Sequence, residues 1–188
     1  MTVQRPSVGT VSTLPFTPCA DALADAQGVK GRVETVPTDG RCTVIIDYSH
    51  KPDALKNVLK TLRPVTVNRL IVVFGCGGDR DHEKRPIMGK VAAENADFVV
   101  VTSDNPRTEK PEDIIEDIVR GLQNSTTAYR VICDRREAIY WTLDNAQPGD
   151  VILLAGKGHE DYQVVGHEKY HMDEREIVAA YLKEKSQL

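Results

Sequence analysis

Short runs of hydrophobic residues recur along the chain after Gly31, each four or five residues long and rich in β-branched side chains. The runs are Thr43 to Ile46, Leu70 to Phe74, Phe98 to Val101, Tyr129 to Ile132 and Val151 to Ala155. Runs of this length and composition are typical of strands that are buried on both faces of a sheet. We therefore predict five buried strands.

Helix signals lie between these runs. Pro52, Pro86 and Pro111 can each occupy the first turn of a helix, where a proline leaves no hydrogen bond unmade. The hydrophobic positions after them recur at helical spacing: Leu55, Val58, Leu59 and Leu62, then Ile87, Met88, Val91 and Ala92, then Ile114, Ile115, Ile118 and Leu122. Three helices with one hydrophobic face each are expected.

Two aspartates predict the starts of two more helices. Asp134 and Asp173 each stand three residues before a glutamate, the spacing of a capping box, and the last helix is expected from Glu174 to Lys183. Strands that alternate with helices predict βαβ units, so we expect an α/β fold with a Rossmann-like, mainly parallel sheet and flanking helices. The segment from Asp161 to Tyr170, with Gly166 near its middle, predicts a late hairpin at one edge.

The composition narrows the class of protein. The 188-residue chain has a net charge of −4, and its pI is near 5.7, whereas a nucleic-acid-binding domain would be basic. No hydrophobic run approaches the roughly 20 residues of a membrane-spanning helix, and neither a polybasic patch nor a secretory signal is visible. We expect a cytoplasmic protein with no membrane or nucleic-acid partner. The four cysteines form no CxxC pair, which predicts reduced thiols and no metal site.

The N-terminal region has no sustained periodicity. Its first 20 residues contain Pro6, Pro15 and Pro18 among small polar residues, which predicts an irregular leader. Residues Ala20 to Ala26 could form a short helix before Gly28.

Polar and charged residues follow four of the predicted strands directly. The four loops are Asp47 to Asp53, Gly75 to Asp81, Ser103 to Glu109 and Gly156 to Glu160. In open α/β sheets, ligands bind outside the carboxyl ends of the strands, where such loops meet. One polar loop would mean little, but four loops at the same edge favour a binding cleft.

The glycine-rich loop favours anion binding without matching a nucleotide motif. Gly75, Gly77 and Gly78 would let the backbone approach a ligand, yet Arg80 stands where a dinucleotide fingerprint needs a third glycine. No Walker pattern for phosphate binding occurs in the chain. The alternative is a tight turn between strand and helix. Arg80 favours the first reading, because a guanidinium held by such a turn can clamp a carboxylate.

The other two loops add a second guanidinium and a carboxylate. Arg107 follows the rigid Pro106, although a β-turn with a solvated arginine would give the same pattern. The Gly156-Lys157-Gly158 segment could hold an anion on its backbone N–H groups, and it leads to His159, which could equally be structural. Glu160 suits an ammonium partner. Arg80, Arg107 and Glu160 together would receive a zwitterion, of which an amino acid is the simplest.

These loops carry a family resemblance. The strings DYSHKPDAL, GCGGDRD, SDNPRTE and GKGHEDYQ, in this order, resemble the C-terminal half of UDP-N-acetylmuramoyl-tripeptide synthetases. These enzymes are the Mur ligases that add the third residue of the peptidoglycan stem peptide. The resemblance extends from about Ala22 to Leu182 and implies a Rossmann-like C-terminal domain over residues 31–188. Residues 1–30 would then be the irregular leader and a remnant of the preceding, central domain.

The resemblance also implies which residues bind the substrate. In members that add meso-diaminopimelate, the matching positions contact that amino acid: Arg80, Asp104, Asn105, Pro106, Arg107, Gly156 and Glu160. Lysine-adding relatives usually lack the arginine of the DNPR motif, so Arg107 points to meso-diaminopimelate, whose second carboxylate suits a second guanidinium. Asp47 and His50 match a segment that faces the nucleotide. No residue of this chain is expected to be catalytic or to bind a metal.

The chain departs from complete ligases of this kind in one respect. Their central domain carries the Walker loop, the Mg²⁺ ligands and a carbamylated lysine, and none of these is recognisable here. ATP and Mg²⁺ are therefore expected for the complete family enzyme and not as tight ligands of this chain. We expect this chain to be the C-terminal, amino-acid-binding part of the ligase and to be inactive by itself. A separate chain that carries the N-terminal and central domains is the partner it would need. A stand-alone diaminopimelate-binding module and an inactive fragment are the alternatives.

Overall fold

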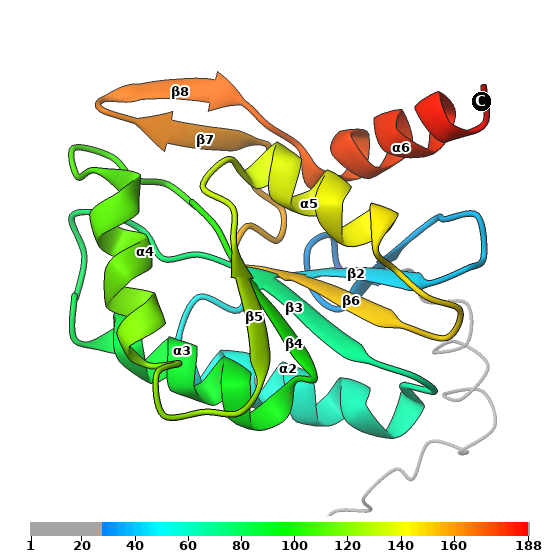
Figure 1. Cartoon of the computed structure of the whole chain (residues 1–188). Helices are drawn as coiled ribbons and strands as arrows, with labels where there is room; N and C mark the ends of the chain where they lie inside the picture. Colours follow the sequence, from blue (N-terminus) through cyan, green and yellow to red (C-terminus); the bar gives the residue numbers. More distant parts are fainter. Residues whose placement is uncertain (1–27, 188) are drawn as a thin grey trace, which may run out of the picture.

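The parallel sheet that the sequence predicts is present in the computed structural model, which describes residues 28–187 (Figure 1). Six strands pair in the order β1-β2-β6-β3-β4-β5. They are β1 (Glu34–Val36), β2 (Thr43–Asp47), β3 (Leu70–Phe74), β4 (Phe98–Val101), β5 (Ala128–Val131) and β6 (Val151–Ala155). All neighbours run parallel except β1, which pairs antiparallel with β2.

Helices cover both faces of this sheet (Figure 1). They are α2 (Pro52–Leu62), the short 3₁₀ turn η1 (Arg63–Val65), α3 (Lys84–Asn95), α4 (Pro111–Arg120), α5 (Arg135–Asp144) and α6 (Glu174–Lys185). Helices α2, α3 and α4 share one hydrophobic core with one face of the sheet, and α5 and α6 share a second core with the other face. Alternate residues of β3 enter the two cores, which explains why this strand is hydrophobic without interruption: Leu70, Val72 and Phe74 on one side, Ile71 and Val73 on the other.

Two strands differ from the prediction. The strand expected at Tyr129 to Ile132 lies one residue earlier, as β5, and all four of its residues are exposed. It was expected to be buried, but it is the edge strand of the sheet and has a neighbour on one side only. Strand β1 was not predicted, because its three residues contain no hydrophobic run. The other predicted strands match within one residue.

Helix α3 differs from the prediction in its buried face. It begins at Lys84, before Pro86, and its Ile87 is half exposed. Gly89 is buried instead, because α3 and α4 cross closely there: a Cβ at Gly89 would lie 2.2 Å from the carbonyl oxygen of Ile118. Small residues at such a crossing let the two helix backbones approach. The hydrophobic faces predicted for α2 and α4 are buried as expected.

Both predicted aspartate caps are present. The carboxylate of Asp134 accepts a hydrogen bond from the backbone N–H of Glu137 at 2.9 Å. The carboxylate of Asp173 accepts one from the backbone N–H of Arg175, also at 2.9 Å. These bonds satisfy N–H groups in the first turns of α5 and α6 that have no partner within the helix.

The late hairpin, β7 (Tyr162–Val165) and β8 (Glu168–His171), forms a separate two-stranded sheet. It lies beyond the main sheet on the side of α5 and α6 (Figure 1). Its first strand is tied to the loop after β4, because the N–H of Arg107 donates to the carbonyl of Val164 at 3.1 Å and the N–H of Gly166 donates to the carbonyl of Arg107 at 2.7 Å. The hairpin therefore supports a loop of the site.

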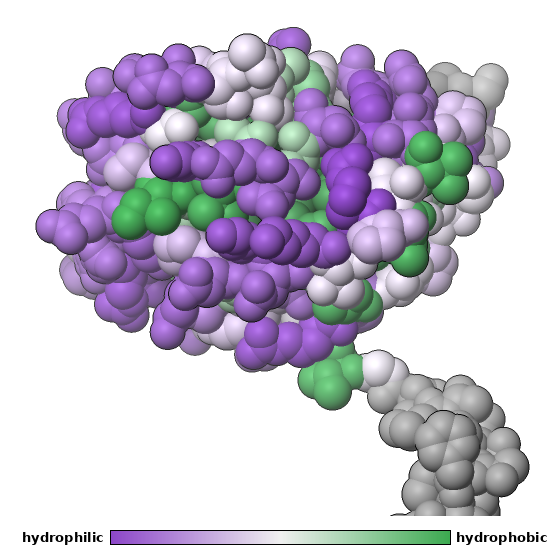
Figure 2. Space-filling model, turned by 90° about the horizontal axis from the view of Figure 1, so that it is seen from below, coloured by the Kyte–Doolittle hydropathy of each residue, from purple (hydrophilic) through white to green (hydrophobic). Residues whose placement is uncertain are grey.

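Some expectations concern residues outside the described range. The irregular leader, the helix at Ala20 to Ala26 and Cys19 all lie there. Cys42, Cys76 and Cys133 are free thiols, and burial raises the pKa of Cys76 to about 12. Among the described residues, no helix has the length and hydrophobicity to cross a membrane. The face seen in Figure 2 is largely hydrophilic, with hydrophobic residues in narrow patches between charged side chains.

Candidate functional site

A cleft of about 650 Å³ lies at the carboxyl ends of the parallel strands. All four loops predicted to meet there contribute to its wall, together with the start of α2. Seven of the nine predicted site residues line it: His50, Arg80, Asp104, Asn105, Arg107, Gly156 and Glu160. Asp47 and Pro106 are buried and do not line the cleft. The sheet topology thus brings together loops that are up to about a hundred residues apart in sequence.

The floor of the cleft is a hydrogen-bonded cluster around a buried lysine. The side chain of Lys157 is fully buried, and its Nζ donates to Oδ1 of Asn105 at 2.9 Å and to the carbonyl of Tyr162 at 2.6 Å. The same Nζ lies 3.2 Å from Oδ1 of Asp104 and 3.5 Å from Oε2 of Glu160. The amide of Asn105 in turn donates to Oε2 of Glu160 at 3.0 Å. One cation therefore joins the loop after β4 to the loop after β6.

The loop after β4 is fixed from its other side by the hairpin. Oδ1 of Asn105 accepts from the N–H of Val164 at 2.9 Å, and the side-chain amide of Gln163 donates to the carbonyl of Asp104 at 2.6 Å. Asp104 and Asn105 are both buried. Their orientation toward the cleft therefore depends on β7 as well as on Lys157.

Arg107 takes a strained backbone conformation that directs its side chain to the glycine loop. Its φ is 53°, in the left-handed region, and its Nη1 donates to the carbonyl of Gly78 at 2.8 Å. A Cβ at Gly78 would lie 1.9 Å from the carbonyl oxygen of Pro106, and a Cβ at Gly77 would lie 2.8 Å from Nη1 of Arg107. The sequence suggested that these glycines admit a ligand. The structure shows that they admit the loop of Arg107.

Arg80 is exposed at the rim of the cleft. It follows Asp79, whose φ is also 53°, and its Nη1 donates to the carbonyl of Asp79 at 3.0 Å. The carboxylate of Asp79 accepts a hydrogen bond from the hydroxyl of Thr108 at 2.7 Å, which lowers the pKa of Asp79. Glu109 accepts from the N–H of Asp79 at 2.5 Å. The two arginine-bearing loops are thus joined, and both guanidinium groups belong to one wall.

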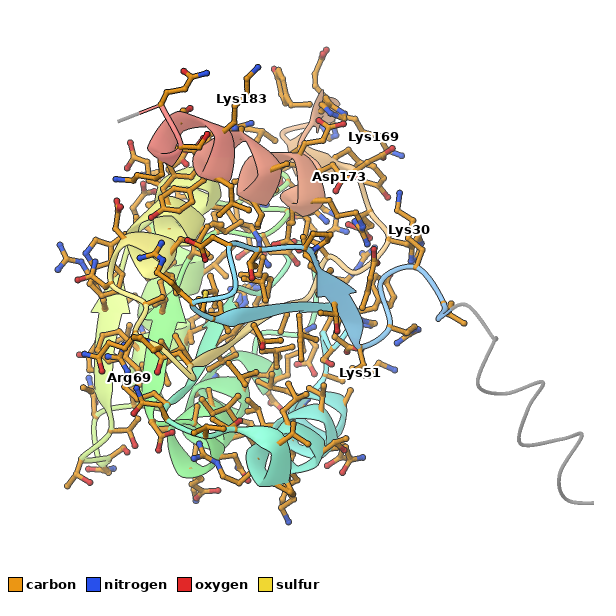
Figure 3. The ribbon with its side chains drawn as sticks, turned by 90° about the vertical axis from the view of Figure 1, so that its right-hand side faces the viewer. Lys30, Lys51, Arg69, Lys169, Asp173 and Lys183 are labelled. Carbon is orange, nitrogen blue, oxygen red and sulfur yellow. The ribbon has the colours of Figure 1, made fainter. Side chains whose placement is uncertain are left out.

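The segment expected to face a nucleotide divides into a structural part and an accessible part. Asp47 is buried, and its carboxylate accepts from the N–H of Val33 at 2.9 Å and from the hydroxyl of Ser49. It anchors the chain before β1 to the end of β2. His50 lines the cleft, and its Nδ1 lies 2.9 Å from the carbonyl of Tyr48. Lys51, beside it, lies at the end of β2 in Figure 3 and also lines the cleft.

Tyr48, which the sequence did not single out, is the aromatic side of the cleft. Its ring lies 4.7 Å from that of His50 and 5.1 Å from that of the exposed His159, and the guanidinium of Arg32 lies 5.0 Å above it. Burial, followed by the negative charge of Glu160, raises the pKa of the Tyr48 hydroxyl. A tyrosine in a loop gives no sequence signal of such a contact.

The described residues do not fit a divalent metal. No group of three or more histidine, cysteine, aspartate or glutamate side chains in residues 28–187 could hold an ion. The cationic side chains that line the cleft are Lys51, Arg80, Lys84 and Arg107, and the ammonium of Lys84 is already bonded to the carbonyl of His50 at 2.9 Å. The arrangement can bind a small ligand that carries both carboxylate and ammonium groups.

The structure is an α/β domain with a charged cleft at the carboxyl ends of its parallel strands, and comparison with known proteins gives its family. The family model for the Mur ligase, glutamate ligase domain matches residues 31–158. This chain belongs to the Mur ligase family.

Several relatives that are about half identical to this chain carry the name UDP-N-acetylmuramoyl-L-alanyl-D-glutamate–2,6-diaminopimelate ligase. The protein from Trichormus variabilis is 54% identical over 171 residues, covering 90% of this chain and 34% of the relative. The one from Clostridioides difficile is 49% identical over 157 residues, covering 84% and 32%. A solved structure of a ligase with this name has a TM-score of 0.78 at 39% identity, covering 92% and 35%. The chain thus spans about a third of the length of these relatives.

Proposed function

We propose that this chain supplies the amino-acid-binding part of an ATP-dependent ligase that adds meso-diaminopimelate to UDP-N-acetylmuramoyl-L-alanyl-D-glutamate. The proposal depends on one observation: a single cleft presents the guanidinium groups of Arg80 and Arg107 on one wall and the carboxylates of Asp104 and Glu160 at its floor. Carboxylates of the amino acid would pair with the first set, and an ammonium group with the second.

Arg107 is the group that would distinguish meso-diaminopimelate from lysine. A guanidinium has five N–H donors, and within residues 28–187 only Nη1 of Arg107 makes a side-chain hydrogen bond. The remaining donors are available to a carboxylate, which can accept two parallel hydrogen bonds from a guanidinium. Lysine has no carboxylate at the end of its side chain and would leave these donors to water.

ATP would bind at the other side of the cleft, next to His50 and Lys51. The sequence contains no Walker pattern, and residues 28–187 contain no group of side chains that could hold a metal ion, so the groups that bind the phosphates and Mg²⁺ would come from elsewhere in the ligase. In the family reaction, ATP activates a carboxylate as an acyl phosphate, which the amine of the amino acid then attacks. This chain would hold that amine-bearing substrate.

Isothermal titration of the purified chain with meso-diaminopimelate and with L-lysine tests the proposal. We expect measurable binding of meso-diaminopimelate and weaker binding of lysine. We also expect no ATP hydrolysis and no amide formation when the chain is mixed with ATP, Mg²⁺, the UDP-muramoyl-dipeptide and meso-diaminopimelate. Formation of the tripeptide product would contradict the expected inactivity of the chain by itself.

Two other functions would give different results in the same experiments. A stand-alone diaminopimelate-binding module would bind the amino acid but would not restore ligase activity to a protein that carries the other Mur ligase domains. An inactive fragment would bind neither amino acid. The charged side chains that line the cleft favour the first alternative over the second. A complementation assay with the N-terminal and central domains of a related ligase separates the first alternative from the leading proposal.

A further inference from the structure

Lys157 lies directly beneath the cleft without lining it. We propose that Lys157 is a positioning residue that holds the carboxylates of Asp104 and Glu160 together in their ionised form, so that the floor keeps one unbalanced negative charge for the ammonium group of the amino acid. This inference rests on the function proposed above and names the device that would make its ammonium site.

The hydrogen bonds of Lys157 leave its ammonium no donor for a ligand. An ammonium group has three donors. Two are used by Oδ1 of Asn105 and the carbonyl of Tyr162, and the third is donated to Oε2 of Glu160 at 3.5 Å. Oδ1 of Asp104 lies 3.2 Å from the ammonium as an ion pair, without accepting a hydrogen bond from it. Because the side chain is also fully buried, Lys157 cannot itself meet a substrate carboxylate.

The cluster carries more negative than positive charge. Two carboxylates share one ammonium, which leaves a net charge of −1 if all three groups are ionised. Oδ1 of Asp104 is buried and accepts no hydrogen bond from the part of the chain that the structure describes. The negative charges of Glu160 and Asp104 also contribute, after burial, to the raised pKa of Tyr48. An incoming ammonium group would complete the charge balance.

Packing alone does not account for a lysine at this position. A buried ammonium loses its hydration, and a hydrophobic side chain of similar volume is often no less stabilising than a buried ion pair. Without the cation, two neighbouring carboxylates repel each other, and one of them takes up a proton. Lys157 would therefore keep both carboxylates of the floor, Asp104 and Glu160, ionised, and two ionised carboxylates attract an ammonium group more strongly than one.

The experiment compares Lys157→Met with Lys169→Met. Lys169 is an exposed lysine on β8 whose Nζ lies 4.0 Å above the ring of Tyr162, so its replacement removes a lysine from the same neighbourhood and leaves the floor intact (Figure 3). Binding of meso-diaminopimelate is measured calorimetrically in phosphate and Tris buffers from pH 6 to pH 8. The difference in heat between the buffers gives the number of protons released.

In Lys157→Met the ligand's ammonium must displace the proton that one carboxylate has taken up. We expect release of up to about one more proton than in Lys169→Met, and an affinity that rises by up to about tenfold per pH unit relative to that control. The control accounts for the other titratable and charged groups that face the cleft or the cluster: His50, Tyr48, Tyr162, Lys51, Lys84, Asp53, Asp81, Arg80 and Arg107.

Equal proton release in the two variants would overturn the role of Lys157 while leaving the proposed function intact. Absence of binding by the unmodified chain would instead overturn the proposed function, and this inference with it. Lys157→Gln, which keeps a hydrogen-bond donor but no charge, replaces the methionine variant if that variant does not fold. If neither folds, carbon NMR of the unmodified chain decides: both Asp104 and Glu160 must be ionised at pH 7, and a protonated carboxyl there would refute the proposal.

Discussion

Truncation of Arg107 tests whether this side chain selects the amino acid or only holds its loop. In the proposed complex its free N–H donors pair with the second carboxylate of meso-diaminopimelate. A charge-assisted hydrogen bond of this kind contributes about 1.5–3 kcal/mol. Arg107→Ala should therefore lower the preference for meso-diaminopimelate over lysine by roughly ten- to a hundredfold.

The structure sets the expected position within that range. Arg107 is only partly buried, so water screens the pair and favours the lower end. Lysine binding should change little, because lysine has no second carboxylate. Arg107→Lys should recover part of the preference, since an ammonium cannot form two parallel bonds to a carboxylate.

The assay is the ratio of the two dissociation constants, measured calorimetrically before and after the substitution. Arg120→Ala, at the C-terminal end of α4, removes an exposed arginine that does not line the cleft and serves as the control for lost net charge. The contrary result is equal weakening for both ligands. Arg107 also donates a hydrogen bond to the carbonyl of Gly78. Equal weakening would therefore mean that its guanidinium holds the glycine loop in place and does not bind the second carboxylate of the ligand.

Three further predictions concern the support of the site and the fold. Gly78→Ala places a Cβ against a carbonyl oxygen 1.9 Å away, so we expect a lower melting temperature and loss of meso-diaminopimelate binding; unchanged binding would show that the loop shifts freely. Glu174→Ala leaves the fully buried Arg135 without its carboxylate and should lower the free energy of unfolding in urea by about 3–5 kcal/mol, and a loss below 1 kcal/mol would contradict this. Hydrogen bonds from Arg175 lower the pKa of Glu34 below its ordinary value of 4.5, so this pair stabilises the fold above that pH and its contribution disappears as the pH falls through the lowered pKa. Glu34→Gln should therefore flatten the acid side of the stability curve, and an unchanged curve would count against the pair.

The sequence by itself determined most of the fold. Three strands were predicted with the bounds that the structure has, because strands buried on both faces are hydrophobic without interruption. The hydrophobic faces of α2 and α4 and the aspartate caps of α5 and α6 follow from local spacing, which is why they could be read without tertiary information.

The sequence also located most of the candidate site. Polar loops directly after parallel strands must meet at one edge of the sheet, and seven of the nine predicted residues do line one cleft there. The family's motifs placed Arg80, Arg107 and Glu160 in it before the geometry was known. Their roles in binding remain predictions.

Only the tertiary structure decided what each residue touches. Gly77 and Gly78 give the same local signal whether a ligand or another loop approaches them, and the approaching group proves to be the loop of Arg107. Gly89 is buried because α4 crosses α3 at that point. The residues of β5 are exposed, and this strand lies at the edge of the sheet.

From the sequence, Lys157 belongs to a segment between two glycines that could hold an anion on its backbone N–H groups, and its side chain was given no role. Two of the oxygens around its ammonium belong to Glu160 and Tyr162, which are close in sequence, but the other two belong to Asp104 and Asn105 in the loop after β4. Only the parallel sheet brings that loop beside Lys157, and no local pattern encodes the contact.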